Sequence, residues 1–485
     1  MNSNILLIIL DSTRARNTSL HGHDNRTTPF LEEFAESATV YEQARAPSIH
    51  SIASHVSIFT GHHVEEHRLT EHESNIDPSH TIWDSLSTEY GHRTGLFTPN
   101  TVLTHASNLA DCFETVDAAS VTGDKSTSSD RLFTDAFDPV DRATREGIAG
   151  NLRRCVEDDF PVRSFANCVN RLYQDYKEGD DFDRQIEPAF GYADSFLEWS
   201  SDCDGPWAAC LNFFDSHYPY YPLEEYDRWG GDRLRELHDS LSGAIAPEFL
   251  SDRPWGELRA LEALYDGGIL QADQAVKYIV EALEERGDLD DTLVVVTSDH
   301  GEGFGERSLV EPGVRMADHS WGIHEVLTHV PLVVKYPGQQ TARRYSDVVS
   351  LTEFPEAVTA SMNENWIGDP FVTDEPVVAS TYRLLERQAE KHADCENIDA
   401  HLGPWRAVYE QGTADVVTKF VRRQDSTATI EIETAQASTL VAADDGGRVQ
   451  EVFDTFEPVS LTDDEAVGQA SAAVEERLAD LGYMR

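Results

Sequence analysis

Short apolar runs without regular polar alternation recur along the chain and are separated by segments of helical pattern. The runs cover Ile5–Leu10, Thr94–Phe97, Trp207–Phe214, Thr292–Thr297 and Val330–Lys335. An apolar run of this length is typical of a strand buried on both faces, as in a parallel sheet covered by helices. Leu31–Ser37 and Ala272–Arg286 show helical spacing, and Gly287 is a typical helix end. The pattern predicts a three-layer α/β sandwich with a mostly parallel central sheet.

The pattern changes beyond about residue 363. Three β-rich segments follow, at Val416–Val421, Thr427–Ile432 and Ser438–Val441, and Asp464–Gly482 has the pattern of a closing helix. We therefore expect a catalytic domain over residues 1–365 and a small C-terminal α+β subdomain over 366–485. Within the first domain, the charged segment from about 122 to 200 has a helical pattern and is expected to be an insertion at the sheet edge.

The charge balance limits the possible partners. Lys and Arg number 38 against 88 Asp and Glu, which gives a formal net charge of −50. Such a charge repels nucleic acid and anionic lipid, so neither is expected as a partner. The acidic residues are spread along the chain, and most basic residues are Arg. This distribution fits either an ordinary solvated acidic surface or adaptation to high salt, and we expect the halophilic alternative.

Targeting signals are not apparent in the sequence. The N-terminal residues Met1–Asn4 carry no basic side chain, and the following apolar run is too short for a signal core. No apolar run approaches the length of a membrane span. The six cysteines form no C-x-x-C pair, which favours a reducing compartment with free or buried thiols. We expect a cytoplasmic protein.

Acidic and imidazole side chains directly follow two of the predicted strands. Asp11 follows the first apolar run, and Asp299 and His300 follow the fourth. In open α/β sheets, the carboxyl ends of the strands form the ligand crevice. Carboxylates and an imidazole at this place suit a divalent cation. Each residue alone could be an ordinary turn residue, so the pattern leaves the metal-site and turn alternatives open.

Three further positions have settings that suit catalysis. Ser51 fits the N-cap of a helix that ends near Gly61, where a hydroxyl could meet a bound oxyanion. His217 follows the third apolar run and could protonate a leaving group. His319 precedes the fifth run. Plain capping is the commoner role of such a serine, and a loop histidine is usually solvated, an expectation that extends to His324 and His329.

Five segments carry a further signal when they are taken together and in order. They read NILLIILDSTRARNTSLHGHDNRTTPFLEEFAESATVYEQARAPS, SIASHVSIFTG, FFDSHYPYYP, TLVVVTSDHGEGFGE and HSWGIHEVLTHVPLVVKYPG. Together they resemble the sulfatase family of the alkaline-phosphatase superfamily, including haloarchaeal sulfatase-like proteins. The resemblance extends from the N-terminus to about Met362.

The resemblance implies roles for individual residues. It makes Asp11, Asp299 and His300 ligands of one divalent cation, with Ca²⁺, Mg²⁺ or Mn²⁺ favoured over Zn²⁺. Ser51 takes the nucleophile position and also touches the cation. The resemblance implies further pocket roles for four residues: His55 in place of an Arg beside the nucleophile, His217 and His319 as oxyanion-binding or leaving-group residues, and Asn100 as a pocket residue.

Several positions depart from the family pattern. Family members carry C-x-P-x-R or S-x-P-x-R, whose first residue is oxidised to formylglycine, whereas this chain has Ser51-Ile52-Ala53-Ser54-His55 without the Pro and the Arg. Ser12 replaces the usual second Asp, and His300 resembles phosphonate- and phosphodiesterase-like members. These departures make formylglycine at Ser51 doubtful and favour displacement through a covalent phospho- or sulfo-enzyme.

The function implied by the resemblance is hydrolysis of a small anionic ester, namely a sulfate, phosphate or phosphonate ester, at one cation site. Two alternatives remain open. The chain could transfer a phospho-group to an alcohol acceptor, or it could be a degenerate member that binds anions without turnover.

Overall fold

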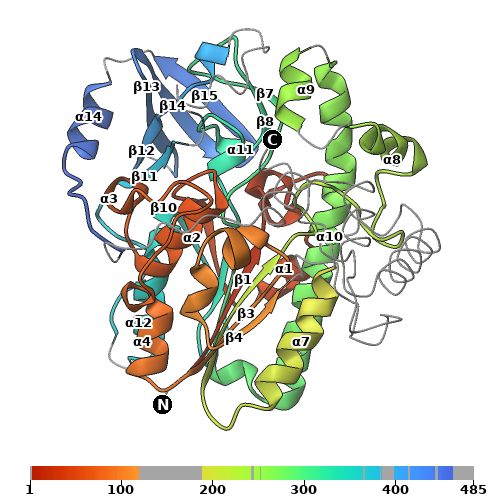
Figure 1. The fold of residues 1–485 in the computed structure, drawn as a ribbon, viewed down its shortest axis with the longest axis vertical. Coiled ribbons are helices and arrows are strands. Elements are labelled where there is room, and N and C mark those ends of the chain that lie inside the picture. Colours follow the sequence, from red (N-terminus) through yellow and green to blue (C-terminus); the bar gives the residue numbers. More distant parts are fainter. Residues whose placement is uncertain are drawn as a thin grey trace, which may run out of the picture.

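The computed structural model describes residues 3–118, 188–241, 245–251, 253–363, 366–382, 384, 398–412, 415–442 and 446–462. Its centre is an eight-stranded sheet with the order β10-β2-β9-β6-β1-β5-β3-β4 (Figure 1). The strands are β1 (Asn4–Leu10), β2 (Thr39–Arg45), β3 (Arg93–Thr98), β4 (Thr115–Ala118), β5 (Trp207–Phe213), β6 (Thr292–Thr297), β9 (Leu332–Lys335) and β10 (Arg343–Ser350). β9 pairs antiparallel with β2 and β6, and the other pairs are parallel. This sheet confirms the predicted fold class.

The central strand β1 shows why the apolar runs lack alternation. Ile5, Leu7 and Ile9 belong to one hydrophobic core, whereas Leu6 and Ile8 belong to the core on the opposite face. Helices α2 (Ser51–Thr60), α4 (Ile82–Thr88) and α12 (Phe354–Ser361) cover the first face. Helices α1 (Pro29–Phe34), α7 (Ala189–Ser201) and α10 (Trp255–Arg286) cover the second (Figure 1). Both faces of the strand are therefore buried in apolar surroundings.

Smaller elements surround the central sheet. They are the hairpin β7 (Gly303–Arg307) and β8 (Arg315–Asp318), with helices α3 (Val64–His67), α8 (Asp232–Asp239), α9 (Ile245–Ser251) and α11 (Glu325–Thr328). Short 3₁₀ turns are η1 (Ala15–Asn17), η2 (Ser19–His21), η3 (Pro78–His80), η5 (Leu109–Cys112), η7 (Leu289–Asp291), η8 (Leu351–Glu353) and η10 (Ile398–Ala400), and η4 (Val102–Ala106) is a π-helical turn.

Helix α10 differs from its sequence prediction in a way that matters for the site. It begins at Trp255 instead of Ala272 and ends, as predicted, at Gly287 with φ 78°. The Gly267–Gly268 pair interrupts the helical pattern in the sequence. A Cβ atom at Gly268 would lie 1.9 Å from the carbonyl oxygen of Asp215. Only glycine permits this approach, which brings the loop after β5 against the helix.

The C-terminal region forms a separate antiparallel sheet, confirming the predicted change of character. Its strands are β11 (Val377–Thr381), β12 (Trp405–Gln411), β13 (Val417–Arg423), β14 (Ser426–Thr434) and β15 (Ala437–Ala442), with α14 (Gly447–Phe453) beside them. The domain boundary at 365/366 stays a prediction. The predicted helix Asp464–Gly482 and most of the predicted insertion at 122–200 lie outside the described residues.

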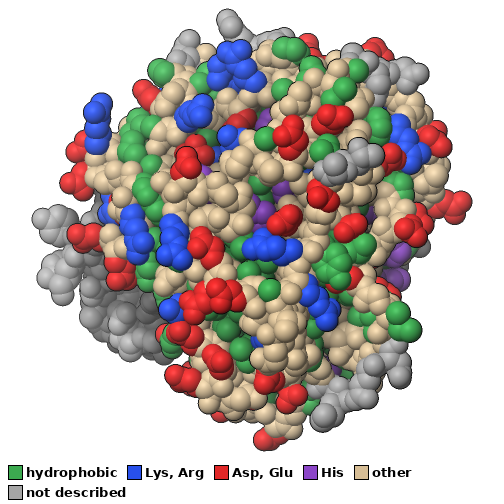
Figure 2. Space-filling model, turned by 180° about the vertical axis from the view of Figure 1, so that it is seen from behind, with side chains coloured by type: hydrophobic (Ala, Val, Ile, Leu, Met, Phe, Trp, Pro, Cys, Tyr) green, Lys and Arg blue, Asp and Glu red, His purple; other side chains and the backbone are tan. Residues whose placement is uncertain are grey.

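The surface and the helices add two observations. Figure 2 shows acidic side chains scattered over one face of the molecule, with Lys and Arg side chains between them. Among the described helices, none combines the length and the apolar character needed to cross a membrane. The thiols of Cys112, Cys203 and Cys210 are free.

Candidate cation and nucleophile site

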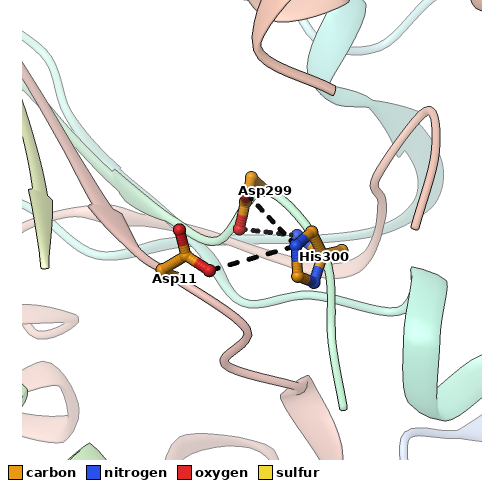
Figure 3. A group of neighbouring side chains, drawn as sticks. All are labelled: Asp11, Asp299 and His300. Carbon is orange, nitrogen blue, oxygen red and sulfur yellow. Dashed lines mark hydrogen bonds and ion pairs between the residues drawn. The ribbon is translucent and has the colours of Figure 1, made fainter. Parts of the chain in front are cut away.

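Three predicted ligands converge at the carboxyl ends of two neighbouring strands. Asp11 follows β1, and Asp299 and His300 come just after β6, its parallel neighbour (Figure 3). Nε2 of His300 lies 3.4 Å from Oδ2 of Asp299 and 3.9 Å from Oδ1 of Asp11. The three ligand atoms lie within 4.8 Å of one another, and all three side chains are fully buried. The sheet topology thus assembles the group that the sequence suggested.

The ring of His300 presents a lone pair to this group. Its Nδ1 lies 3.0 Å from the carbonyl oxygen of Gly301, which can only accept, so Nδ1 carries the proton. Nε2 is then the ring nitrogen that faces Asp11 and Asp299 and would bind a cation. A Cβ atom at Gly301 would lie 2.0 Å from the carbonyl oxygen of Val326. Glycine at this position allows the loop to pack tightly and fixes the orientation of the ring.

The electrostatics of the two carboxylates fit a divalent cation. Burial, together with the negative charge of Asp299, raises the pKa of Asp11 to about 7. Burial likewise raises the pKa of Asp299 to about 7. Oδ2 of Asp299 has no hydrogen-bond partner among the described residues, although it is completely buried. Two buried carboxylates with an orphaned oxygen call for a compensating positive charge, which a cation bound by these side chains would supply.

Asp11 is held in place by two side-chain amides. Nδ2 of Asn100, in the loop after β3, donates to Oδ2 of Asp11 at 3.2 Å, and Nδ2 of Asn212, in β5, donates to the same atom at 3.1 Å. Asn100 was a predicted pocket residue, whereas Asn212 was not predicted. An Asn inside the apolar run at Trp207–Phe214 was the available signal, because a buried polar residue needs partners.

Ser12 joins the two carboxylates without supplying a third. It adopts a left-handed conformation with φ 62°. Its N–H donates to Oδ1 of Asp299 at 3.4 Å, and its hydroxyl donates to Oδ1 of Asp11 at 3.2 Å. Its carbonyl accepts from the hydroxyl of Tyr265 at 2.8 Å. This sparsely populated backbone conformation is held by contacts on both sides of the turn.

Ser51 lies at the start of α2, beside the ligand group. The helix begins at Ser51 itself and His50 is the N-cap residue, which corrects the predicted N-cap position by one residue. The predicted helix end at Gly61 is confirmed, with φ 77°. Oγ of Ser51 lies 3.3 Å from Nε2 of His300. The N-terminus of α2 therefore lies beside the ligand group.

His55 lies one turn further along α2 and is also buried. Its Nδ1 donates to the carbonyl oxygen of Ser51 at 2.8 Å and lies 3.6 Å from Oδ2 of Asp299. Its Nε2 has no partner among the described residues. Burial lowers the pKa of His55 to about 4, so the ring is neutral near pH 7. His55 therefore cannot replace the charge of an arginine at this position.

Of the two remaining candidates, His319 lies next to His300, and His217 lies next to His319. The ring centroid of His319 is 4.4 Å from that of His300 and 5.3 Å from that of His217. Nδ1 of His319 lies 3.4 Å from Oε2 of Glu302, a buried carboxylate that was not predicted from the sequence. Burial and the charge of Asp318 raise the pKa of Glu302 well above its usual value.

The expectation of solvated loop histidines is wrong for the segment between β8 and β9. His319 and His329 are buried. His324 caps α11 by accepting from the N–H of Val326 at 3.2 Å, and Nε2 of His329 contacts the carbonyl oxygen of Glu42 at 2.8 Å. The segment packs against the end of the sheet, a tertiary contact that a local pattern does not reveal.

Comparisons with known proteins give a consistent assignment. A family model described as Sulfatase matches residues 3–363. The Multifunctional alkaline phosphatase superfamily protein PehA of Trinickia caryophylli is 36% identical over 84 residues, covering 17% of this chain and 15% of that protein. Arylsulfatase K of Bos taurus is 25% identical over 208 residues, covering 42% of this chain and 33% of that protein. The chain thus spans a third or less of these curated relatives.

Solved structures share the fold over most of their length. The phosphonate monoester hydrolase of Agrobacterium radiobacter superposes with a TM-score of 0.58 at 16% identity and covers 89% of each chain. The phosphonate monoester hydrolase SpPMH from Silicibacter pomeroyi superposes with a TM-score of 0.56 at 16% identity and covers 88% of each chain.

Proposed function

The chain belongs to the sulfatase family of the alkaline-phosphatase superfamily, and from that premise we propose that it hydrolyses a phosphate- or phosphonate-type ester with Ser51 as the nucleophile. The observation that carries the proposal is the position of the Ser51 hydroxyl, 3.3 Å from His300 and inside the buried ligand group. The substrate is a small anionic ester, because the cation and the N-terminus of α2 both favour negative charge.

One divalent cation would be held by Asp11, Asp299 and His300, with the Ser51 hydroxyl as a further ligand. The carboxylates favour Mg²⁺, Mn²⁺ or Ca²⁺, and the imidazole also permits Zn²⁺. When bound, the cation would lower the pKa of the hydroxyl and neutralise charge on the transferred group. Asn100, Asn212 and the backbone of Ser12 would keep the two carboxylates oriented.

The reaction divides into two displacements at phosphorus. In the first, Oγ of Ser51 forms a bond to phosphorus as the bond to the ester oxygen breaks. The Ser51 hydroxyl passes its proton to solvent water, and the leaving oxygen takes one up from His217 or His319. In the second, water attacks phosphorus and the bond to Oγ breaks. One proton of the water restores the Ser51 hydroxyl, the other leaves with the phosphate or phosphonate, and the histidine regains its proton from solvent.

The choice of phosphorus over sulfur rests on the unmodified serine. A formylglycine hydrate releases sulfate by collapsing to the aldehyde, which a serine cannot do. A phospho-serine instead releases phosphate when water attacks phosphorus. The stretch Ser51-Ile52-Ala53-Ser54-His55 lacks the Pro and the Arg of the maturation signal. His55 is also neutral near pH 7, so no arginine-like cation stands beside the nucleophile.

Turnover of a matched set of p-nitrophenyl esters tests the proposal. The phosphate and phenylphosphonate esters should release p-nitrophenol with added Mg²⁺ or Mn²⁺ and stop doing so with a chelator. When alcohols are added, the product should still be free phosphate or phosphonate. A transferase would instead pass the phosphoryl group to the alcohol and make a new ester. If the protein binds inorganic phosphate tightly but turns over none of the esters, it is an anion-binding protein and not an enzyme.

A sulfate ester is the second candidate, because the matching family model and relatives such as arylsulfatase K are named for that activity. In the formylglycine mechanism of the family, it requires oxidation of the Ser51 side chain to an aldehyde. Peptide mass spectrometry of protein purified from its native host distinguishes the two candidates. An intact Ser51 supports the phosphorus ester, and an aldehyde at Ser51 restores the sulfate ester.

A further inference from the structure

Helix α11 is tied directly to the loop that carries His300. The N–H of Gly301 donates to the carbonyl oxygen of Leu327 at 2.9 Å, and the N–H of Glu302 donates to that of Val326 at 3.1 Å. The chain reaches α11 through the segment that contains His319. The position of this one-turn helix therefore sets the backbone on both sides of the site.

Glu325, the first residue of α11, is held by two buried cations. Nζ of Lys419, in β13, lies 2.7 Å from Oε1 of Glu325, and an Nη atom of Arg45, in β2, lies 3.0 Å from Oε2. Lys419 also donates to the carbonyl oxygen of Ile323, just before the helix. Burial opposes the charge of Glu325, but Lys419 and Arg45 outweigh it and lower its pKa to about 2. The Glu325 carboxylate is thus charged, and each of its oxygens forms an ion pair with one of the two cations.

The C-terminal sheet also holds the far end of the same helix. The hydroxyl of Tyr409, in β12, lies 2.8 Å from Oγ1 of Thr328. Nζ of Lys419 lies 5.0 Å from the centre of the Tyr409 ring, and the Arg45 guanidinium lies 4.9 Å from it. The two cations, the ring and Glu325 form one buried network across β2, α11 and the C-terminal sheet.

We propose that Lys419 is a positioning residue of the active site. Through Glu325 and Ile323 it holds α11 in place, and α11 in turn holds the Gly301–Glu302 backbone that aims His300. The C-terminal sheet thereby completes the cation site without touching substrate. The catalytic part of this inference rests on the proposed function, but the structural part does not.

The chain offers a matched control for a Lys419 substitution. Lys335, in β9, is another buried lysine, whose Nζ contacts the carbonyl oxygens of Gln339 and Ser37 at a place outside the α11 network. Lys419→Met and Lys335→Met each remove one buried ammonium group. Lys419→Arg keeps the charge, and Arg45 still pairs with Glu325 in every Lys419 variant.

Hydrogen exchange and cation titration test the proposal on the full chain. In Lys419→Met, the amides of Gly301 and Glu302 should exchange at least about 10-fold faster than in wild type. Mn²⁺ affinity by calorimetry should fall by about 10-fold, the size seen when an outer partner of a ligand is removed. Lys335→Met should leave both quantities unchanged, and Lys419→Arg should restore them in large part.

The outcomes separate this inference from the proposed function. Unchanged exchange at Gly301 and Glu302 in a folded Lys419→Met variant overturns it, as does an equal effect of Lys335→Met. If Lys419→Met does not fold, Glu325→Gln replaces it, and protected amides in that variant overturn the proposal equally. If wild type binds no divalent cation, the proposed function fails, yet the exchange measurement still decides whether Lys419 positions the loop.

Discussion

The Oγ atom of Ser51 lies 3.3 Å from Nε2 of His300, although 249 residues separate the two in the sequence. The first begins α2 and the second follows β6, so the contact joins the start of a helix to the end of a central strand. It brings a hydroxyl, an imidazole lone pair and the carboxylates of Asp11 and Asp299 into one buried group. The predicted chemistry follows from that group.

Removing one carboxylate should abolish tight cation binding. Asp299→Asn keeps the shape of the side chain but removes the charge that the cation compensates. We expect the Mn²⁺ affinity by calorimetry to fall by more than about 100-fold, since even outer partners of a ligand contribute 10- to 100-fold. Asp273→Asn is the control. Burial raises the pKa of Asp273 to about 7 as well, but the Asp273 carboxylate accepts from the N–H groups of Phe30 and Leu31 in α1. Equal affinities in wild type and Asp299→Asn would remove Asp299 from the cation site.

The cation-free chain should lose stability as the pH rises. Asp11 and Asp299 have pKa values of about 7 in the folded chain against 3.8 in the unfolded chain, so the folded chain binds more protons between these values. The free energy of unfolding should therefore fall as the pH rises from about 4 to 7, by at most about 1.4 kcal/mol per pH unit for each group.

Denaturant titrations in chelator measure this slope, and the Asp11→Asn/Asp299→Asn double variant isolates it from other carboxylates. The wild-type slope should exceed that of the double variant, and saturating Mn²⁺ should reduce the excess because the cation takes the place of the protons. Identical slopes for the two proteins would contradict the account of the buried pair.

Asn212 should matter for the cation although it does not bind it. Its amide donates to Oδ2 of Asp11, so Asn212→Ala leaves that carboxylate with one amide donor fewer. We expect cation affinity to fall by about 10-fold. The control is Asn108→Ala, which removes an amide whose Nδ2 donates to the backbone carbonyl of Ile76, outside the ligand group. A loss of affinity as large in the control as in Asn212→Ala would indicate a general effect on folding.

The acidic composition predicts stabilisation by salt. With a formal net charge of −50, carboxylates repel one another, and salt screens that repulsion. The melting temperature should rise steadily from about 0.1 M to about 3 M KCl. A flat or falling melting temperature would argue for an ordinary acidic surface.

The sequence was sufficient for the parts of the fold that depend on long apolar runs. All five predicted strands of the central sheet are present, because strands buried on both faces leave an uninterrupted apolar signal. β2, β4 and β10 escaped prediction because Thr39–Arg45, Thr115–Ala118 and Arg343–Ser350 carry polar residues along their length. The Gly267–Gly268 pair hid the first half of α10, since its close contact with Asp215 is a tertiary feature.

The same distinction holds for the site. Asp11, Asp299 and His300 were predictable because each stands at the end of an apolar run. Glu302 and Lys419 were not, because their partners His319 and Glu325 come from other elements of the fold. His329 was expected in solvent, and the packing of its segment against the sheet buries it instead. Local pattern locates the strand ends, but only the assembled chain shows which side chains support them.

The claim that Ser51 is the nucleophile is tested most directly by comparing two serine variants of α2. Ser51→Ala removes the proposed nucleophile, and Ser54→Ala removes a buried hydroxyl that donates to the carbonyl oxygen of Ser48 at 3.2 Å. The measurement is the rate of p-nitrophenol release from the best phosphate or phosphonate ester at saturating Mn²⁺. The account predicts a fall of at least about 1,000-fold for Ser51→Ala, with cation affinity within about 10-fold of wild type, and near wild-type turnover for Ser54→Ala. Turnover retained in a folded, cation-binding Ser51→Ala variant would contradict it.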